Sequence, residues 1–315
     1  MNNHTNKNIV FLSGSLRSGT TVLGLMCAHH KNIYAPGEFD FFFDYITEHG
    51  SADKKEFIEK LEKDRVFQES GLVINKHLMP DEIIKDFIRQ LSMNNEDQYL
   101  LLNIHRNYEK IPRLFPNAKY IHLLRDPRDV AKSAVGMGWC GNVYYGVDYW
   151  LQSEYSWDIL IQKLNKENFI EIKFEELIEE PLHELSRICH FLRLDIDENM
   201  LNYPQNSTYS LPDKNLVNQW KRKQQKYEIQ LIEGRLGKYL ENKGYTLSGY
   251  KFHKPTKIEK LRLSIQNKLY QYKFGLNRYG ASLFLGEKLT RHLKLKKLNL
   301  KICNKINKID LKYLK

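Results

Sequence analysis

Cysteine is scarce in this sequence, and long apolar runs are absent. The cysteines, Cys27, Cys140, Cys189 and Cys303, are scattered and form no Cys-x-x-Cys pair. This spacing indicates neither a disulfide framework nor a zinc site, and it fits the reducing cytoplasm. The sequence contains no run of about 18 apolar residues, which is the length needed to cross a membrane. Residues 1–7 contain no apolar stretch of the signal-peptide type. We therefore expect a cytoplasmic protein without a membrane-spanning helix.

Acidic residues are scarce near the end of the chain. Residues 251–315 contain 18 Lys and Arg against 3 Asp and Glu, a net charge of +15. The preceding 250 residues therefore have a net charge of −4, although the whole chain has +11. Because the positive charge belongs to the tail, the overall charge is no evidence that the body of the protein binds nucleic acid.

The length and this change in composition predict a main domain and an extension. A chain of 315 residues suits one large domain, or one domain with an extension. We expect residues 1–250 to form the domain and residues 251–315 a basic extension. Apolar residues early in the extension have helical spacing, with Lys and Arg on the other face. They are Ile258, Leu261, Ile265, Leu269 and Tyr272. Later apolar residues, from 293 to 302, fit a strand or a helix equally well.

Three roles are open for this extension. Its cationic side chains could hold the protein peripherally at the anionic inner surface of a membrane. They could also bind nucleic acid, or lie in solvent on a helix that packs on the domain. The membrane is favoured over nucleic acid because the apolar spacing is amphipathic, and the packed helix is as well supported as either.

Strands and helices alternate along the first part of the chain. Apolar runs typical of buried strands occur at 8–13, 33–35, 99–104, 119–124 and 169–174. Helical patterns occur at 20–30, 80–93, 128–135, 147–164 and 182–192. This alternation predicts an α/β fold, a three-layer sandwich with a central parallel sheet flanked by helices, similar to P-loop NTPases.

Residues 14–21 form a glycine loop after the first predicted strand and read Gly-Ser-Leu-Arg-Ser-Gly-Thr-Thr. A strand that leads through such a loop into a helix presents backbone N–H groups and a helix N-terminus to an anion. The loop resembles the Walker A phosphate loop, but Thr20 stands where that motif has lysine, and Arg17 carries the positive charge. We therefore expect a phosphate site. The alternative is an ordinary turn that needs glycine for positive φ.

A second anion-binding element is predicted at residues 119–133. A strand ends at Arg125, and Asp126-Pro127 opens a helix, since Asp suits the cap and Pro the first turn. Ser133 follows about two turns into this helix. Its hydroxyl could face back toward the guanidinium of Arg125, which suits bidentate binding of phosphate oxygens. The alternative is a capped helix beside a surface arginine.

Four residues with suitable chemistry follow four different predicted strands. They are Arg17, Glu38, His105 and Arg125. Ligands of parallel sheets bind beyond the carboxyl ends of the strands. We therefore expect these four side chains at one edge of the sheet.

Three segments together resemble the landmarks of PAPS-dependent sulfotransferases, in the order of that family. They are residues 14–21, Leu-Arg-Asp-Pro-Arg-Asp-Val-Ala-Lys-Ser at 124–133 and Ile-Lys-Phe-Glu-Glu-Leu-Ile-Glu-Glu-Pro at 172–181. The similarity spans about residues 8–245, and it is greatest to bacterial enzymes and those acting on carbohydrate or tyrosine. It implies PAPS (3′-phosphoadenosine 5′-phosphosulfate) as donor and 3′,5′-ADP as product. The sulfuryl group would pass in line to a hydroxyl of a glycan, a lipid-linked sugar or another small molecule.

The resemblance also implies roles for matching residues. Five loop residues would hold the 5′-phosphosulfate: Arg17, Ser18, Gly19, Thr20 and Thr21. Arg125 and Ser133 would hold the 3′-phosphate, and the region of Trp220 and Lys221 would lie near the nucleotide. Phe174 stands where family members often have tyrosine, so that a polar contact near the adenine would be missing.

Sulfuryl transfer makes modest demands on the protein. Negative charge grows on the bridging oxygen of the leaving bisphosphate, where Arg17 and the loop amides could stabilise it. No metal is needed for this step, in contrast to kinases, where Mg²⁺ bridges the phosphates. No Walker B aspartate is evident, since the fourth strand ends in Arg125, and this favours sulfuryl over phosphoryl transfer. The alternatives are another P-loop enzyme such as a kinase, or an anion-binding module that acts through the tail.

Two residues compete for the role of general base. His105 has an ordinary pKa of about 6.5, which suits proton transfer near neutrality, and it occupies the place of the catalytic histidine in the phenol and steroid enzymes of the family. Glu38, in Pro36-Gly37-Glu38, resembles the glutamate base of tyrosylprotein and several carbohydrate sulfotransferases. Burial or a polar partner would have to raise its pKa. Glu38 is slightly favoured as the base. The alternatives to a catalytic role are that His105 is a core histidine and that Glu38 is a solvated turn residue.

An aromatic stretch has two interpretations. It comprises Trp139, Tyr144, Tyr145, Tyr149 and Trp150. These rings could line the acceptor cleft, but aromatic residues are more often part of the core, and the core is favoured.

Overall fold

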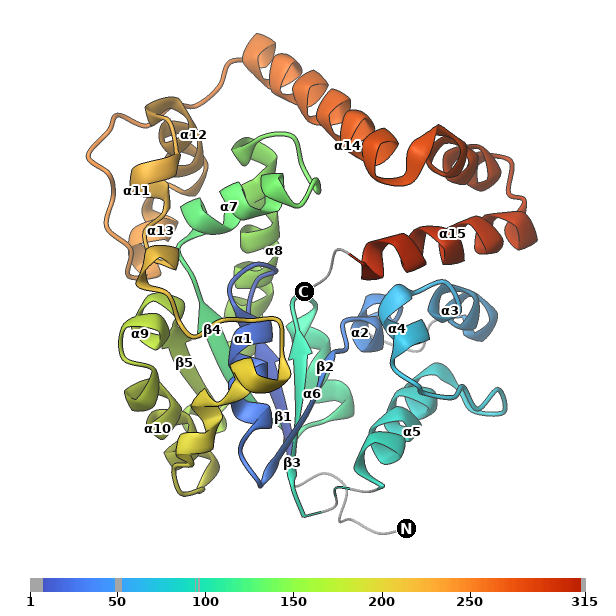
Figure 1. Cartoon of the computed structure of the whole chain (residues 1–315), viewed down its shortest axis with the longest axis vertical. Helices are drawn as coiled ribbons and strands as arrows, with labels where there is room; N and C mark the ends of the chain where they lie inside the picture. The colour runs from blue at the N-terminus through green and yellow to red at the C-terminus, as the bar shows by residue number, and fades with distance from the viewer. Residues whose placement is uncertain (1–7, 49–52, 94, 96, 313–315) are drawn as a thin grey trace. The chain divides into compact units, whose positions relative to one another are not determined.

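The computed structural model describes residues 8–312 except 49–52, 94 and 96. Residues 1–7, where the sequence shows no signal-type stretch, lie outside the described part. Figure 1 labels the helices and strands of the chain. The chain divides into two compact units. Unit 1 comprises residues 1–125 and 152–217, and unit 2 comprises residues 126–151 and 218–315. This division does not test the expected boundary at residue 250, which stays a prediction.

Unit 1 contains a parallel sheet of five strands, as predicted. The strands are β1 (Ile9–Ser13), β2 (Ile33–Glu38), β3 (Tyr99–Ile104), β4 (Lys119–Leu124) and β5 (Phe169–Lys173). Their order is β2-β3-β1-β4-β5, and every pairing is parallel. Strand β1 is therefore central, with β3 and β4 as neighbours. The carboxyl ends of all five strands meet at one edge.

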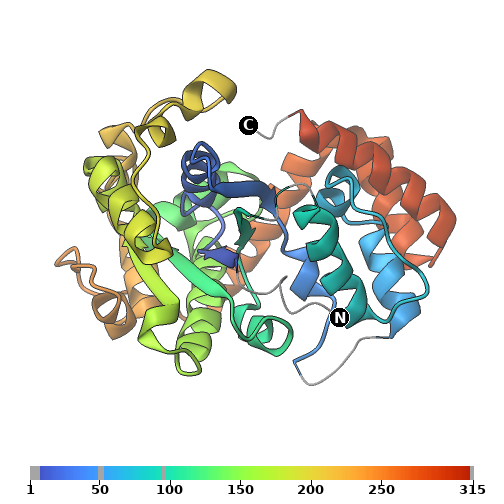
Figure 2. The ribbon, with the colours of Figure 1, turned by 90° about the horizontal axis from the view of Figure 1, so that it is seen from below.

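Helices cover both faces of this sheet. They are α1 (Thr20–Ala28), α2 (Phe41–Asp44), α3 (Lys54–Leu61), α4 (Arg65–Glu69), α5 (Pro80–Ser92), α6 (Ile111–Leu114), α9 (Phe174–Glu179) and α10 (Pro181–Leu192). Helix α8 (Val143–Ile161) begins in unit 2 and ends in unit 1. In Figure 2 the strands lie between α10, in yellow-green, and α5, in teal. This is the predicted three-layer α/β sandwich.

Two hydrophobic cores hold the layers together. Alternate residues of a strand face opposite sides of a sheet. Accordingly, Phe11 of β1 packs with a phenylalanine-rich core that includes Phe42 and Phe87, whereas Leu12 packs with residues of α1, α9 and α10. Phe39, Phe41, Phe42 and Phe43 all belong to the first core, where their rings pack against one another. The sequence analysis assigned no element to these residues, and the structure places α2 there.

Unit 2 is helical. It contains α7 (Pro127–Gly136), the start of α8, α11 (Trp220–Lys223), α12 (Lys226–Leu236), α13 (Lys238–Asn242), α14 (Lys257–His292) and α15 (Lys296–Leu311). Arg128 is fully buried, and its guanidinium pairs with Asp126 (2.7 Å) and Glu233 (2.8 Å) beneath the ring of Trp220. Because a buried charge is stable only with such partners, this cluster fixes α7 against α11 and α12.

The basic extension is helical, as predicted. A capping box of Thr256 and Glu259 starts α14. The helix is interrupted at Gly280, where φ is 76° and ψ is 159°. The segment that fitted a strand or a helix equally well belongs for the most part to helix α15. No helix in the described part of the chain is long and apolar enough to span a bilayer.

Candidate active site

The glycine loop after β1 is tightly packed. A Cβ added to Gly14 would lie 2.6 Å from the carbonyl oxygen of Leu123, and one added to Gly19 would lie 2.5 Å from the ring of Phe174. Gly19 also has φ of 101°, which favours glycine. The amide of Gly14 donates a hydrogen bond to the hydroxyl of Tyr108 (2.9 Å). Both glycines are therefore required by close approach of neighbouring atoms.

The loop has the features of an anion cradle. Helix α1 begins at Thr20 with no side-chain cap and no acidic residue in its first turn, so that an anion can approach its N–H groups. The buried hydroxyl of Ser15 has no hydrogen-bond partner among the described residues. Arg17 is exposed and has φ of 71°, a left-handed conformation that is strained for arginine. These features fit a phosphate group.

Ser18 holds the backbone of the loop. The amide and the hydroxyl of Ser18 both donate to the carbonyl oxygen of Ser15, at 3.0 and 2.6 Å. Ser18 is fully buried, whereas Thr21, in the first turn of α1, is partly exposed. The hydroxyl proton of Ser18 is thus committed to the loop itself.

Arg125 lies against the loop. Its Nη1 donates to the carbonyl oxygen of Arg17 and its Nη2 to that of Leu216, both at 3.0 Å. The guanidinium stacks on the ring of Phe174 at 4.1 Å, and the same ring closes against Gly19. The two arginines that the sequence places after different strands are therefore neighbours in unit 1.

His105 is buried at the end of β3 between two partners. Its Nδ1 contacts Asp40 Oδ2 at 2.8 Å, and its Nε2 lies 3.0 Å from the hydroxyl of Thr20. Burial alone would lower the pKa of His105, but the Asp40 carboxylate, with a smaller contribution from Glu38, outweighs burial and raises it. For Asp40 the effects are reversed: burial alone would raise its pKa, but the charges of His105 and Arg106 lower it. Asp40 therefore orients the ring, and the ring holds Thr20.

Glu38 ends the edge strand β2 and lines a cavity of about 270 Å³. The remaining lining residues come from β2, the residue after it, α4 and its C-terminal end, and α5. They are Tyr34, Pro36, Phe39, Val66, Glu69, Ser70 and Leu91. Glu38 is therefore at the wall of a small, partly apolar cavity, whereas both ring nitrogens of His105 have partners inside the protein.

Ser133 and Trp220 belong to unit 2. Ser133 lies in α7, which begins with the predicted Asp126 cap and Pro127. That Ser133 binds the 3′-phosphate together with Arg125 of unit 1 stays a prediction. The ring of Trp220 lies 3.6 Å from the Arg128 guanidinium, and its Nε1 is buried without a partner among the described residues.

The aromatic stretch of unit 2 includes a core residue. Trp150 is completely buried and packs edge-on against Tyr239. Tyr149 donates from its hydroxyl to the carbonyl oxygen of Trp139 (3.3 Å). For Trp150 the favoured interpretation as core is therefore confirmed.

The structure adds two residues, Asp40 and Tyr108, that the sequence analysis did not assign to the site, and it shows a further contact of Phe174. Asp40 orients His105, Tyr108 holds Gly14, and Phe174 supports Arg125 and Gly19. Asp40 has a sequence signal, since it lies two residues after Glu38 at the same strand end. The sequence analysis expected Phe174 near the adenine, without the polar contact that a tyrosine would make. In the structure its ring stacks on the guanidinium of Arg125.

Comparisons with known proteins identify the class. A model of the sulfotransferase family matches residues 10–198, which is more than half of the chain. The chain therefore belongs to the sulfotransferase family, as the sequence motifs predicted.

Relatives are distant. Protein-tyrosine sulfotransferase A of Caenorhabditis elegans is 26% identical over 214 residues, which cover 62% of this chain and 52% of that protein. A putative protein-tyrosine sulfotransferase of Caenorhabditis briggsae is 26% identical over 209 residues, covering 62% and 69%. An uncharacterized protein of Aquifex aeolicus (strain VF5) is 24% identical over 222 residues, covering 64% and 27%. The match thus spans about a quarter to about two thirds of these relatives.

Solved structures show the same fold. The sulfotransferase domain of the Synechococcus PCC 7002 olefin synthase has a TM-score of 0.58 at 24% identity and covers 78% of this chain and 98% of that one. The sulfotransferase domain of the curacin biosynthetic pathway has a TM-score of 0.52 at 23% identity, covering 73% and 97%.

Proposed function

We propose that this chain is an enzyme that transfers a sulfuryl group from PAPS to a hydroxyl of an acceptor. The observation that carries this proposal is the contact of Arg125 with the loop carbonyl of Arg17 (3.0 Å). This contact brings a second cationic group to the phosphate loop, as a nucleotide with phosphates on both the 3′ and the 5′ position of its ribose requires. Membership of the sulfotransferase family supports the same reaction.

The donor would be held at both ends. The amides of Gly19, Thr20 and Thr21, together with the Arg17 guanidinium, would bind the 5′-phosphosulfate. Arg125 would bind the 3′-phosphate, with Ser133 as its partner. PAPS supplies the sulfuryl group when bound, and 3′,5′-ADP remains. The Arg17 guanidinium and the loop amides would stabilise negative charge on the leaving side, and we propose that they do so without a metal ion.

We assign the general base to Glu38 and a positioning role to His105. Glu38 lines the cavity in which an acceptor hydroxyl could lie. His105 is engaged on both ring nitrogens, by Asp40 and Thr20, so that its contribution is to hold the first residue of α1. The cavity of about 270 Å³ suits one sugar or aromatic ring of a small-molecule or glycan acceptor.

The base assignment is tested with labelled PAPS and a panel of saccharide and phenolic acceptors. The variant Glu38→Gln should lower kcat by about 10²- to 10⁴-fold and leave the affinity for 3′,5′-ADP unchanged. Glu69→Gln, in the same cavity, is the matched control and should keep most of the turnover. His105→Asn should weaken 3′,5′-ADP binding because Thr20 loses its partner. Near-normal turnover of Glu38→Gln would remove Glu38 from the mechanism, and failure of the wild type to bind 3′,5′-ADP would refute the function.

We further propose that the enzyme is cytoplasmic and that residues 251–315 contact an anionic membrane surface. Nucleic acid is less favoured as a partner because the exposed apolar side chains of α14 would gain nothing from a phosphate backbone. The family to which the chain belongs gives no support to the alternative of a kinase.

A further inference from the structure

Helix α14 has one face that packs on the rest of unit 2 and one that does not. Tyr270 donates from its hydroxyl to the carbonyl oxygen of Val135 (3.1 Å), and Asn267 accepts from the amide of Gly141 (2.6 Å). Leu263 is buried on the same side. These contacts fix the rotation of the helix about its own axis. Most side chains of the opposite face therefore remain in solvent, although Tyr272, among those named below, also packs edge-on against Phe284 (5.5 Å between ring centroids).

The solvent face of α14 is apolar along five turns. Its large side chains recur every three or four residues, which places them in one stripe. They are Ile258 (67% exposed), Leu261 (62%), Ile265 (49%), Leu269 (66%), Tyr272 (46%) and Leu276 (37%). Scattered exposed apolar residues are common, but a continuous stripe of this kind marks a surface that contacts another apolar phase.

Cationic side chains border the stripe on both sides. At 100° per residue, Arg262 and Lys273 fall on one border, and Lys257 and Lys268 on the other. All four are exposed. No Asp or Glu occurs between Glu259 and Glu287. Long cationic side chains can extend to lipid headgroups while their stems cover apolar surface.

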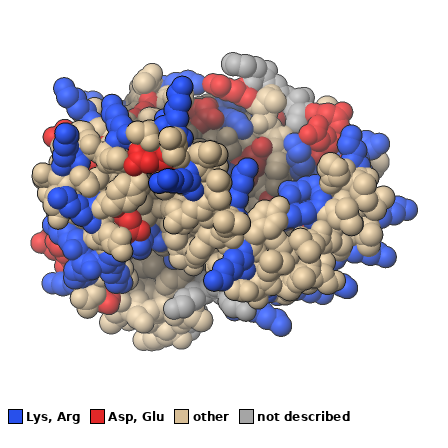
Figure 3. Space-filling view, turned by 90° about the horizontal axis from the view of Figure 1, so that it is seen from above, with Lys and Arg blue, Asp and Glu red and all other residues tan. Residues whose placement is uncertain are grey.

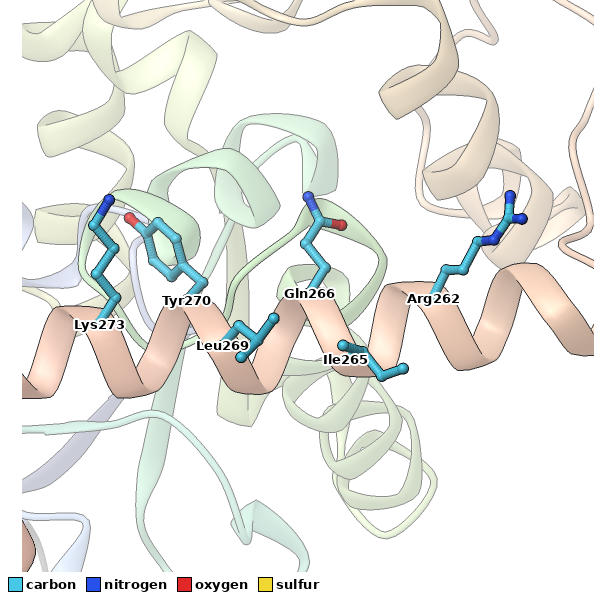
Figure 4. Close-up of a pocket in the computed structure, with 6 residues that line it drawn as sticks. All are labelled: Arg262, Ile265, Gln266, Leu269, Tyr270 and Lys273. Atoms are coloured by element: carbon cyan, nitrogen blue, oxygen red, sulfur yellow. The ribbon is translucent and has the colours of Figure 1, made fainter.

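A hollow of about 470 Å³ lies along one border of the stripe. Figure 4 shows Arg262, Gln266, Tyr270 and Lys273 in a row along α14, with Ile265 and Leu269 beside them. The two cationic residues stand at the ends of the row, about 16 Å apart along the helix axis. The face drawn in Figure 3 carries many Lys and Arg side chains beside continuous uncharged surface.

We propose that this face of α14, from Ile258 to Leu276, binds the surface of a bilayer that contains anionic phospholipid. The apolar stripe would enter the headgroup boundary, and Arg262, Lys273 and Lys268 would contact lipid phosphates. The charge pattern decides for this occupant, since a stripe bordered by one sign of charge matches an anionic interface and would repel a second copy of itself. The inference develops the membrane contact proposed above and does not depend on the proposed catalysis.

Vesicle flotation of the full chain tests this proposal. The vesicles contain phosphatidylcholine alone or with phosphatidylserine. The wild type should bind the anionic vesicles, and salt should weaken this binding. The charge variant Arg262→Gln/Lys273→Gln should lower the affinity roughly 30-fold, from about fivefold for each cationic group. The apolar variant Ile265→Ser/Leu269→Ser should lower it by at least about tenfold.

Two control variants distinguish binding through this surface from non-specific adsorption to vesicles. Leu211→Ser removes a 57% exposed leucine of unit 1, and Lys55→Gln removes an exposed lysine of α3. Both should bind vesicles like the wild type. Unchanged 3′,5′-ADP affinity in all variants would show that folding and the proposed donor site are intact.

Three outcomes would overturn the proposal. The wild type would fail to bind anionic vesicles, or the α14 variants would bind as well as the controls. Alternatively, the wild type would not bind vesicles but would form dimers, and Ile265→Ser/Leu269→Ser would abolish these dimers. This result would assign the stripe to a second copy of the chain. None of these results would affect the test of sulfuryl transfer.

Discussion

The role proposed for Arg125 can be tested by comparing two nucleotides that differ in one phosphate. The variant Arg125→Ala removes a guanidinium that donates to Arg17 O and Leu216 O and stacks on Phe174. If this group also binds the 3′-phosphate, its loss should affect 3′,5′-ADP much more than 5′-AMP, which lacks that phosphate.

The magnitudes follow from the contacts. Loss of charge-assisted hydrogen bonds to a phosphate costs about 3 kcal/mol, which is roughly 100-fold in Kd for 3′,5′-ADP. For 5′-AMP, Arg125→Ala removes the bond to the Arg17 carbonyl, which supports the loop. That bond is worth about 1 kcal/mol, or roughly fivefold. Arg125→Lys should fall between the wild type and Arg125→Ala, since lysine keeps the charge but loses the planar fork and the stacking on Phe174.

Isothermal titration calorimetry at fixed ionic strength measures both ligands. Arg113→Ala is the matched control because it removes an arginine that pairs with Asp81 on α5. It should leave both affinities unchanged. Equal losses for 3′,5′-ADP and 5′-AMP in Arg125→Ala would refute the assignment and reduce Arg125 to a support of the loop.

Further predictions concern the loop and the core. Gly19→Ala should lower both the Tm and the 3′,5′-ADP affinity, because its Cβ would lie 2.5 Å from Phe174; Gly71→Ala has φ of 72° but open space around it, so it should cost about 1–2 kcal/mol and leave binding intact. His122 is buried between Glu154 (3.2 Å) and Glu171 (3.1 Å); burial alone would lower its pKa, but the two carboxylates raise it. Its stabilisation should therefore be complete below the unfolded pKa of about 6.5 and lost as pH rises through the folded pKa. Urea unfolding should show that the free energy of unfolding of the wild type exceeds that of His122→Gln by an amount that shrinks as pH rises. A difference that stays constant with pH would contradict this.

Much of the sheet, and of the candidate site at its carboxyl edge, could be predicted from the sequence. Strand ends are local signals, and in a parallel sheet every strand presents its carboxyl end to the same edge. For this reason Arg17, Glu38, His105 and Arg125 could be assigned to one edge without knowledge of the strand order. The extension was predicted as helical because its apolar residues repeat with the period of a helix.

The partners of these residues could not be predicted in the same way. Asp40 and His105 are 65 positions apart, and Gly14 and Tyr108 are 94 apart. No periodicity encodes such contacts. Helix α2 was missed because it is only four residues long, and its consecutive Phe41, Phe42 and Phe43 have no amphipathic period. The ring of Phe174 carries no polar signal, so its stacking on Arg125 becomes evident only when β4 and α9 are seen together.

The residue that begins α1 has a consequence for competition inside a cell. Thr20 occupies the position at which Walker loops have an amine, and its hydroxyl lies 3.0 Å from Nε2 of His105, a ring that Asp40 orients. A γ-phosphate would therefore lack the lysine amine that neutralises it in Walker loops. ATP, which shares the adenosine of the proposed donor, should therefore be a weak competitive inhibitor of the proposed sulfuryl transfer.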